Sequence, residues 1–260
     1  MSATPQDLMI ARLFFNAAFP VMQVLLDDDP KLHKAFANFT ATVQFGARND
    51  DKLVACTLKF DNGQVEVIQA PAESYDLALT FPSVSKMNAL LRGGLALPGI
   101  KGNILLLPKI LKLLMGLMIM SPKKKPRDYD KQKLKVKCSL YMITRALSTY
   151  NKLGDPDMHE WCLRQPDRIY QFSVEPYPET GIACYLRVKA GKSKSGHGVY
   201  TRRSPFVHFH FLSVEGAIKV LQKEVPFVRA AELGYIETIG SPEYAVQLND
   251  FMAILQSMLT

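Results

Sequence analysis

Residues 54–63 read VACTLKFDNG, and residues 182–191 repeat their pattern as IACYLRVKAG. The repeat continues in the same order along the chain. Residues 77–91 (LALTFPSVSKMNALL) align with residues 207–221 (VHFHFLSVEGAIKVL), and three short segments also match: 9–12 with 142–145, 29–33 with 155–159, and 102–103 with 240–241. Because the offset changes only gradually, five matches in one order indicate two copies of one domain. We expect domains at 1–122 and 138–260, joined by a basic linker at 123–137.

Each copy is expected to contain the same succession of elements. Two helices come first, at 8–26 and 30–38 in copy one and at 140–153 and 156–164 in copy two. Four strands follow, at 39–46, 53–60, 64–69 and 75–81, and at 169–175, 182–189, 197–202 and 206–212. Asp29, Asp155, Ser83 and Ser213 occupy helix-capping positions, and a final helix starts after Asn103 or Ser241. Runs of strands bracketed by helices indicate an α+β fold.

The bulk composition is that of a folded globular protein. The 260 residues are 48% hydrophobic and 22% charged. The four cysteines have no C-x-x-C spacing, so we expect neither a zinc site nor a disulfide framework. We recognise no secretory signal, and a cytoplasmic location is the expectation. Residues 104–120 are interrupted by Pro108, Lys109, Lys112 and Gly116, so they make a poor transmembrane helix, which needs about 20 apolar residues.

Positive charge is concentrated in one segment. The chain carries +8, and residues 121–137 hold eight cations against two acids, or +6. The remainder is close to neutral, so we do not expect a nucleic-acid surface. Two interpretations of the basic run stay open: a solvated linker, or contact with anionic lipid headgroups through Lys123, Lys124, Lys125 and Arg127, each contributing on the order of 1 kcal/mol.

Motifs for catalysis are not found in the sequence. It has no G-x-S-x-G, no phosphate-binding P-loop and no G-x-G-x-x-G. The stretch GKSKSGHG (191–198) is interpreted as a flexible loop. His208 and His210 share one face of a strand, but no third ligand is placed to complete a metal site, so an outward polar face is expected. His33 and His159 recur at equivalent positions, which indicates a structural role such as capping. We predict no catalytic residue, metal or cofactor.

The apolar pattern differs between the two final helices. Along residues 108–120, Lys109, Lys112 and Gly116 form one narrow stripe and every other position is apolar. The equivalent segment, 243–259, is conventionally amphipathic. A helix that is apolar nearly all round is either fully buried or has a second apolar partner. A ligand, the other domain, a second subunit and a bilayer all remain candidates for that partner.

A series of motifs in copy one resembles the sterol carrier protein family of non-specific lipid-transfer proteins. The series comprises the hairpin around DNG, the strand DLALTF (76–81), a Ser-led helix with ALLRGG (89–94), and IKGN (100–103) before an apolar helix. The resemblance covers most of copy one and, more faintly, copy two, where the turn becomes KAGKSKSG. It implies a sheet of about five strands covered by helices, with an apolar tunnel that holds a sterol, acyl chain or isoprenoid.

The expected function is therefore non-catalytic binding, and transfer, of a hydrophobic lipid. The alternative is an accessory subunit that presents a lipid substrate to a biosynthetic enzyme. A filled core remains the competing interpretation of the apolar strand faces. Expected partners are the lipid, an anionic membrane in transient contact and, further, a second copy or an enzyme. The predicted lipid-binding residues are Leu77, Leu79, Phe81, Met87, Leu90, Leu91, Leu106, Leu111, Leu114, Met115, Met118, Val207, Phe209, Phe211 and Phe251.

Overall fold

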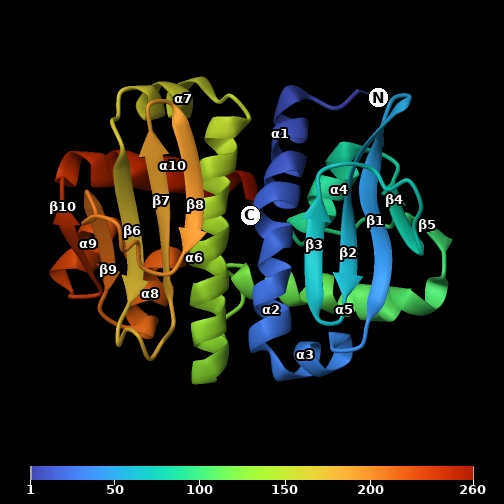
Figure 1. Cartoon of the computed structure of the whole chain (residues 1–260), viewed down its shortest axis with the longest axis horizontal. Coiled ribbons are helices and arrows are strands. Elements are labelled where there is room, and N and C mark those ends of the chain that lie inside the picture. Colours follow the sequence, from blue (N-terminus) through green and yellow to red (C-terminus); the bar gives the residue numbers. More distant parts are fainter. Residues whose placement is uncertain (1, 260) are drawn as a thin grey trace. The chain divides into compact units, whose positions relative to one another are not determined.

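The structure, a computed structural model, describes residues 2–259. The chain divides into two compact units, one of residues 1–121 (with 258–260) and one of residues 122–257. Each unit is an α+β structure, as the sequence predicted, and is built on one five-stranded sheet, as the family resemblance implied; the sequence pattern alone indicated four of the five strands (Figure 1).

Unit 1 begins with a helical segment that runs from residue 5 to residue 28. It comprises α1 (Pro5–Leu13), a π-helical turn η1 (Phe14–Ala18), a 3₁₀ turn η2 (Phe19–Val21) and α2 (Met22–Asp28). The irregular turns surround Pro20, which has no backbone N–H to continue the α-helical ladder. The short helix α3 (Pro30–Phe36) follows, and the Asp29 carboxylate caps it by accepting hydrogen bonds from the backbone N–H groups of Lys31 and Leu32.

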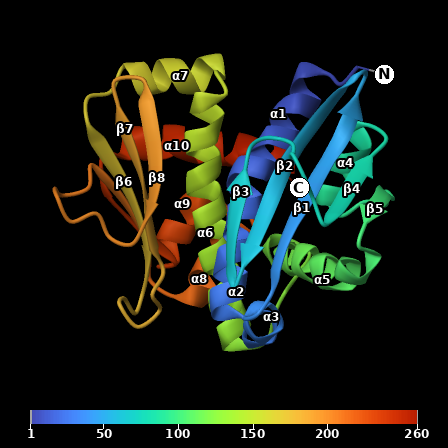
Figure 2. The ribbon, with the colours of Figure 1, turned by 45° about the vertical axis from the view of Figure 1, so that its right-hand side comes forward.

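The sheet of unit 1 has the order β3-β2-β1-β4-β5. Its strands are β1 (Thr40–Asn49), β2 (Lys52–Asp61), β3 (Gln64–Ile68), β4 (Leu77–Phe81) and β5 (Gly99–Gly102). The central pair β1–β4 is parallel and the other pairs are antiparallel. Helix α4 (Val84–Leu91) starts at the Ser83 cap and packs on β1 and β4. Figure 2 shows α1 and α4 behind the strands.

The C-terminal part of unit 1 is the apolar segment singled out in the sequence. The turn η3 (Ile104–Leu106) follows the Asn103 cap and leads into α5 (Leu107–Leu117), which ends in a further turn, η4 (Met118–Met120). Helix α5 packs on α2. Gly116 allows α5 to approach α2 and α3 closely, because a Cβ at that position would lie 3.2 Å from Leu25 Cδ1 and 3.3 Å from Leu32 Cδ1.

Unit 2 repeats the strand order of unit 1, as β8-β7-β6-β9-β10, with β6–β9 as its parallel pair. The strands are β6 (Arg168–Val174), β7 (Ala183–Lys189), β8 (Lys192–His197), β9 (Val207–Phe211) and β10 (Ile236–Gly240). The helices are α6 (Tyr129–Lys152), α7 (Pro156–Leu163), α8 (Val214–Leu221), α9 (Phe227–Glu232) and α10 (Pro242–Leu259). Helix α6 packs on β7 and β8 (Figure 1). Descent of both units from one duplicated domain stays a prediction.

Two predictions for unit 2 were wrong: the start of one helix and the assignment of one strand as a loop. Helix α6 begins at Tyr129 rather than near residue 140, so the second half of the predicted linker is helical; the Asp128 carboxylate caps it by accepting from Lys131 N–H. The stretch GKSKSGHG is also not a flexible loop, because residues 192–197 form β8.

The hairpin turns of the two units explain the second error. Ala190 and Gly191 have φ angles of 44° and 83°, and Asn62 and Gly63 have 46° and 84°. Two successive positive φ angles are the signature of a type I′ turn, which Asn-Gly favours and Ala does not. The turn is therefore retained in unit 2 with a residue that gives no sequence signal for it.

Candidate functional site

The predicted ligand space lies between the sheet and helices of unit 1. Leu77, Leu79 and Phe81 point inward from β4 and are at most 1% exposed, and Met87 on α4 is fully buried. The parallel register pairs Leu79 with Phe45 on β1. The three predicted β4 positions and Met87 thus come together in one core.

Phenylalanine rings fill much of this core. The Phe45 ring centroid lies 5.4 Å from that of Phe81 and 5.2 Å from that of Phe19, and Phe15 lies 5.6 Å from Phe19. These separations are those of packed aromatic pairs. Aromatic contacts thus pack this part of the core, and a tunnel stays a prediction.

The predicted residues on the helices occupy a different environment. Leu90, Leu91, Leu106, Leu114 and Met118 are half-buried, whereas Leu111 and Met115 are exposed. A Cβ placed on Gly93 would lie 3.1 Å from Met118 Cε, so the chain just after α4 lies close to the start of η4. The predicted helix residues are therefore partly accessible, in contrast to the fully buried residues of β4, and Leu111 and Met115 are the most exposed of them.

In unit 2 the predicted apolar residues also form a core. Val207, Phe209 and Phe211 are buried, and the Phe209 ring stacks on Phe172 at 4.8 Å. Phe251 on α10 is half-buried, with its ring 5.7 Å from that of Trp161. Phe209 and Phe251 are thus packed against aromatic neighbours, as Phe81 is in unit 1.

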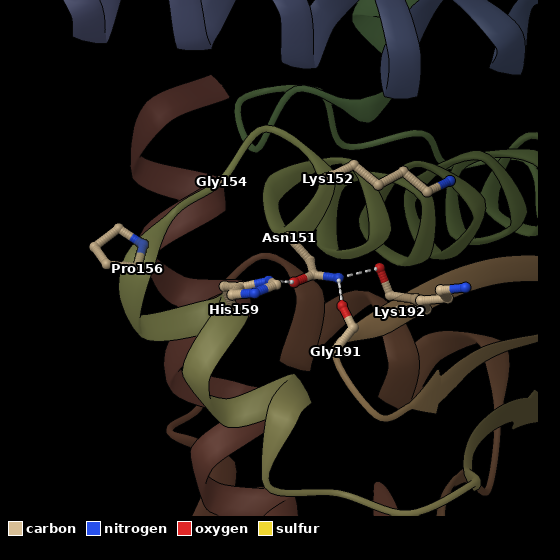
Figure 3. Close-up of a pocket in the computed structure, with 8 residues that line it drawn as sticks. Asn151, Lys152, Gly154, Pro156, His159, Gly191 and Lys192 are labelled. Carbon is tan, nitrogen blue, oxygen red and sulfur yellow. Dashed lines mark hydrogen bonds between the residues drawn. The ribbon is translucent and has the colours of Figure 1, made fainter.

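A cavity of about 520 Å³ lies where the end of α6, the start of α7 and the β7–β8 turn meet (Figure 3). Asn151 Nδ2 donates to Gly191 O and to Ser193 Oγ, both at 2.9 Å, and His159 Nδ1 lies 3.2 Å from Asn151 Oδ1. These bonds hold the hairpin turn against the helix, so the polar groups of this cavity serve a structural role.

Unit 1 holds its own hairpin in the same manner. Gln23 Nε2 donates to Gly63 O at 3.2 Å, and Gln23 Oε1 accepts from Val65 N–H at 2.8 Å. His33 Nδ1 lies 2.9 Å from Leu26 O, at the end of α2. The two histidines that recur in the sequence thus contact the end of the preceding helix in both units, in agreement with the predicted structural role.

A second cavity, of about 800 Å³, lies beside the β1–β2 turn and β5. It is bordered by charged residues of both signs, among them Arg48, Asp50 and Lys101, and by apolar residues, among them Phe81 and Leu97. Phe81 is the single predicted lipid-binding residue that borders either of these two cavities. Neither cavity therefore corresponds to the predicted ligand space.

The cysteines are poorly suited to nucleophilic chemistry. All four cysteines are buried, and none of them forms a disulfide within the part of the chain that the structure describes. Burial raises the pKa of Cys56, and it raises the pKa of Cys162 and of Cys184 to about 12. Since the thiolate is the reactive form, Cys56, Cys162 and Cys184 stay in the unreactive thiol form near neutral pH.

Sequence reasoning missed a polar cluster on the outer face of the unit 2 sheet. Ser173 Oγ lies 2.8 Å from His208 Nε2, and His210 Nε2 lies 2.8 Å from Glu175 Oε1. The pKa of His208 is lowered, first by burial and then by the neighbouring His210. Ser173 is itself only 4% exposed, so the cluster satisfies buried polar groups. Within residues 2–259, no three His, Cys, Asp or Glu side chains are grouped to hold a metal ion.

The basic run is attached to unit 2 rather than free along its length. Lys125 Nζ lies 2.5 Å from Glu224 Oε1, and the Lys124 carbonyl accepts from Lys135 Nζ at 2.8 Å and from Gln222 Nε2 at 3.1 Å. The side chains of Lys123, Lys124, Lys125 and Arg127 are exposed. Contact of these four cations with lipid headgroups stays a prediction.

One helical stretch, Pro5–Asp28, has the length and apolar composition of a membrane span. Two thirds of its most apolar window, 67%, is buried inside the protein. A buried core helix meets the same criteria, so this stretch is weak evidence for a membrane span.

Comparison with known proteins gives structural likenesses only. No protein-family model matches the chain, and no curated protein matches it. The chain is similar to the crystal structure of sterol carrier protein 2, with 19% identity over 40% of this chain and 92% of that one, at a TM-score of 0.31. It is also similar to the solution structure of the sterol carrier protein domain 2 of Helicoverpa armigera, with 19% identity over 45% of this chain and 94% of that one, at a TM-score of 0.31. A third similar structure is the sec-alkylsulfatase Pisa1 from Pseudomonas sp., with 10% identity over 55% of this chain and 28% of that one, at a TM-score of 0.26.

Proposed function

We propose that unit 1 binds a hydrophobic or amphipathic lipid without catalysing a reaction on it, and that the chain carries this lipid. The ligand would lie between the inner face of β4 and the helices α4 and α5. Desolvation of its apolar surface, at roughly 25 cal/mol per Å², would supply the affinity. A sterol, a fatty acyl chain and an isoprenoid all satisfy this requirement.

The observation that carries the proposal is the half-buried apolar border of the core. Leu114 on α5, Met118 at the start of η4 and Leu91 at the end of α4 are half-buried. Phe81 on β4 and Met87 on α4, which are predicted to line the same site, are fully buried. A flexible thioether such as Met118 adapts to ligands of different shape, so movement of these side chains would open the core to a lipid.

The first experiment identifies what the purified protein retains. Native mass spectrometry, followed by organic extraction, should reveal a co-purifying lipid at up to one equivalent per chain. Uptake of cis-parinaric acid and of dehydroergosterol then tests the emptied protein. Protein that carries no lipid and takes up neither probe would contradict the proposal.

A substitution locates the site. Leu114→Trp should reduce probe uptake at least tenfold, because the larger side chain occupies the border of the core, with modest loss of stability. The matched control is Met252→Trp, since Met252 lies 11 residues after Ser241 just as Leu114 lies 11 residues after Asn103. Unchanged uptake in Leu114→Trp, or an equal loss in both variants, would exclude α5 as a wall of the site.

A further inference from the structure

Helix α5 has an apolar face on each side. Ile110 and Leu113 are 1% exposed and form the face that packs into unit 1. Leu111 and Met115, four residues apart, lie on the opposite side of α5 and are 41% and 71% exposed, and Ile104 in the preceding turn η3 is 60% exposed. Packing within unit 1 therefore explains the apolar residues on the buried face of α5 but not those on its exposed face.

Lysines flank the exposed face. Lys112 follows Leu111 and is exposed. Lys109 is half-buried, and its Nζ lies 4.4 Å from the ring centroid of Phe39, so its stem runs along apolar surface. We define the docking face as the exposed side of η3 and α5, consisting of Ile104, Leu105, Pro108, Leu111, Lys112 and Met115. Leu105 is 83% exposed.

Charge in unit 1 is divided along the chain. All acidic residues of residues 1–121 precede residue 77. From residue 77 to residue 121 the sequence contains five Lys or Arg side chains and no Asp or Glu. The segment of unit 1 that carries the docking face is therefore cationic along its length. Positive charge of this kind is complementary to an anionic surface.

We propose that the docking face binds the surface of an anionic phospholipid bilayer. Ile104, Leu105, Leu111 and Met115 would enter the boundary between headgroups and acyl chains, as the apolar face of an interfacial helix does. Lys112 would contact lipid phosphates, with its stem lying along the apolar surface. This goes beyond lipid carriage, because it assigns a separate external surface to a different partner.

The chemistry of the face favours a bilayer over a protein partner. Protein interfaces are centred on aromatic or arginine side chains that fill pockets. The docking face has neither type of residue; its members are aliphatic or thioether side chains and a lysine. Aliphatic side chains bordered by lysine need no matching pocket, and a fluid bilayer accommodates them without one.

Vesicle co-sedimentation of the full chain tests the proposal. Vesicles of phosphatidylcholine with 30% phosphatidylglycerol provide the anionic surface. The double variant Leu111→Asn/Met115→Asn should bind these vesicles with an affinity reduced about tenfold or more. The matched control is Val246→Asn/Ile254→Asn, which changes two apolar side chains of α10 that are 52% and 42% exposed and should bind as the unchanged chain does.

The charge contribution is tested separately. Lys112→Gln should weaken binding about fivefold, in line with one surface cation. Lys194→Gln, at an exposed position of β8, should have no effect. Binding should fall between 50 and 500 mM salt and be much weaker on pure phosphatidylcholine.

Three results would overturn the inference. The first is equal binding by the Leu111→Asn/Met115→Asn variant and the unchanged chain. The second is a dimer in sedimentation equilibrium that dissociates in this variant, since the face would then be covered by a second copy. The third is loss of cis-parinaric acid uptake, without vesicles, in the same variant; the face would then be the lipid site itself. Absence of any bound or taken-up lipid would refute only the carriage proposal and leave docking standing.

Discussion

Three leucine-to-alanine substitutions in η3 and α5, at increasingly exposed positions, test whether this segment has one buried and one exposed apolar face. Leu113, Leu111 and Leu105 are 1%, 41% and 83% exposed. Each substitution removes the same three carbon atoms, and Ala keeps helix propensity high. The free energy of unfolding of unit 1 should therefore decrease in proportion to how deeply each side chain is buried.

The magnitudes follow from the exposed fractions. Burial of three carbon atoms is worth about 2.4 kcal/mol. Leu113→Ala also leaves a cavity, which raises its expected loss to about 3–4 kcal/mol. Scaling by the buried fraction gives at most about 1.4 kcal/mol for Leu111→Ala and about 0.4 kcal/mol for Leu105→Ala.

The assay must distinguish the two units. Trp161 is the single tryptophan of the chain and lies in unit 2, so its fluorescence in a denaturant titration reports that unit. Amide hydrogen exchange of peptides from β1 and β4, measured by mass spectrometry, reports unit 1. The Trp161 transition should be unchanged in all three variants. A loss in Leu105→Ala as large as that in Leu113→Ala would refute the assignment of an exposed apolar face.

Two further predictions concern unit 2. Ala190→Gly should stabilise it by about 0.5–1 kcal/mol, because Ala190 holds a positive φ that is unfavourable for an L-residue with a Cβ; a lower midpoint of the Trp161 transition would show that the turn is not strained. The pKa of His208 is lowered in the folded protein, chiefly by burial and then by His210, and the opposing effects of Glu175 and Glu237 are smaller. The unfolded chain therefore binds the proton more tightly, so the stability of unit 2 should decrease as the pH falls below about 6.5. In His208→Gln the decrease between pH 7.5 and 5.5 should be smaller, and an identical pH dependence would exclude His208 as a contributor.

Much of the architecture was visible in the sequence because it depends on local signals. Asp29 and Ser83 are capping residues whose side chains bind the first backbone N–H groups of the following helix. The alternation of Leu77, Leu79 and Phe81 correctly predicted the inner face of β4. These features follow from the chemistry of a few neighbouring residues.

Features that depend on distant residues or on atypical residues were missed. Ala190 adopts a conformation that Gly or Asn normally signals, so β8 was misplaced. Strand β5 is only four residues long and exposed, which leaves no alternating pattern to detect. The contact between Ser173 and His208 depends on the register of two parallel strands 35 residues apart. At the candidate site, the sequence predicted which residues are apolar but not which of them, such as Leu111, would face outward.

The open sheets of both units leave four edge strands, and each of them has an exposed charged side chain. Glu66 lies on β3, Lys101 on β5, Lys192 and Lys194 on β8, and Glu237 on β10. A charge on an edge strand opposes the addition of a strand from another molecule, because pairing would bury it. Aggregation by edge-to-edge pairing is therefore disfavoured in both units, even though unit 1 exposes leucines elsewhere. Neutral replacements at these five positions would be the sequence changes that endanger solubility without affecting either apolar core.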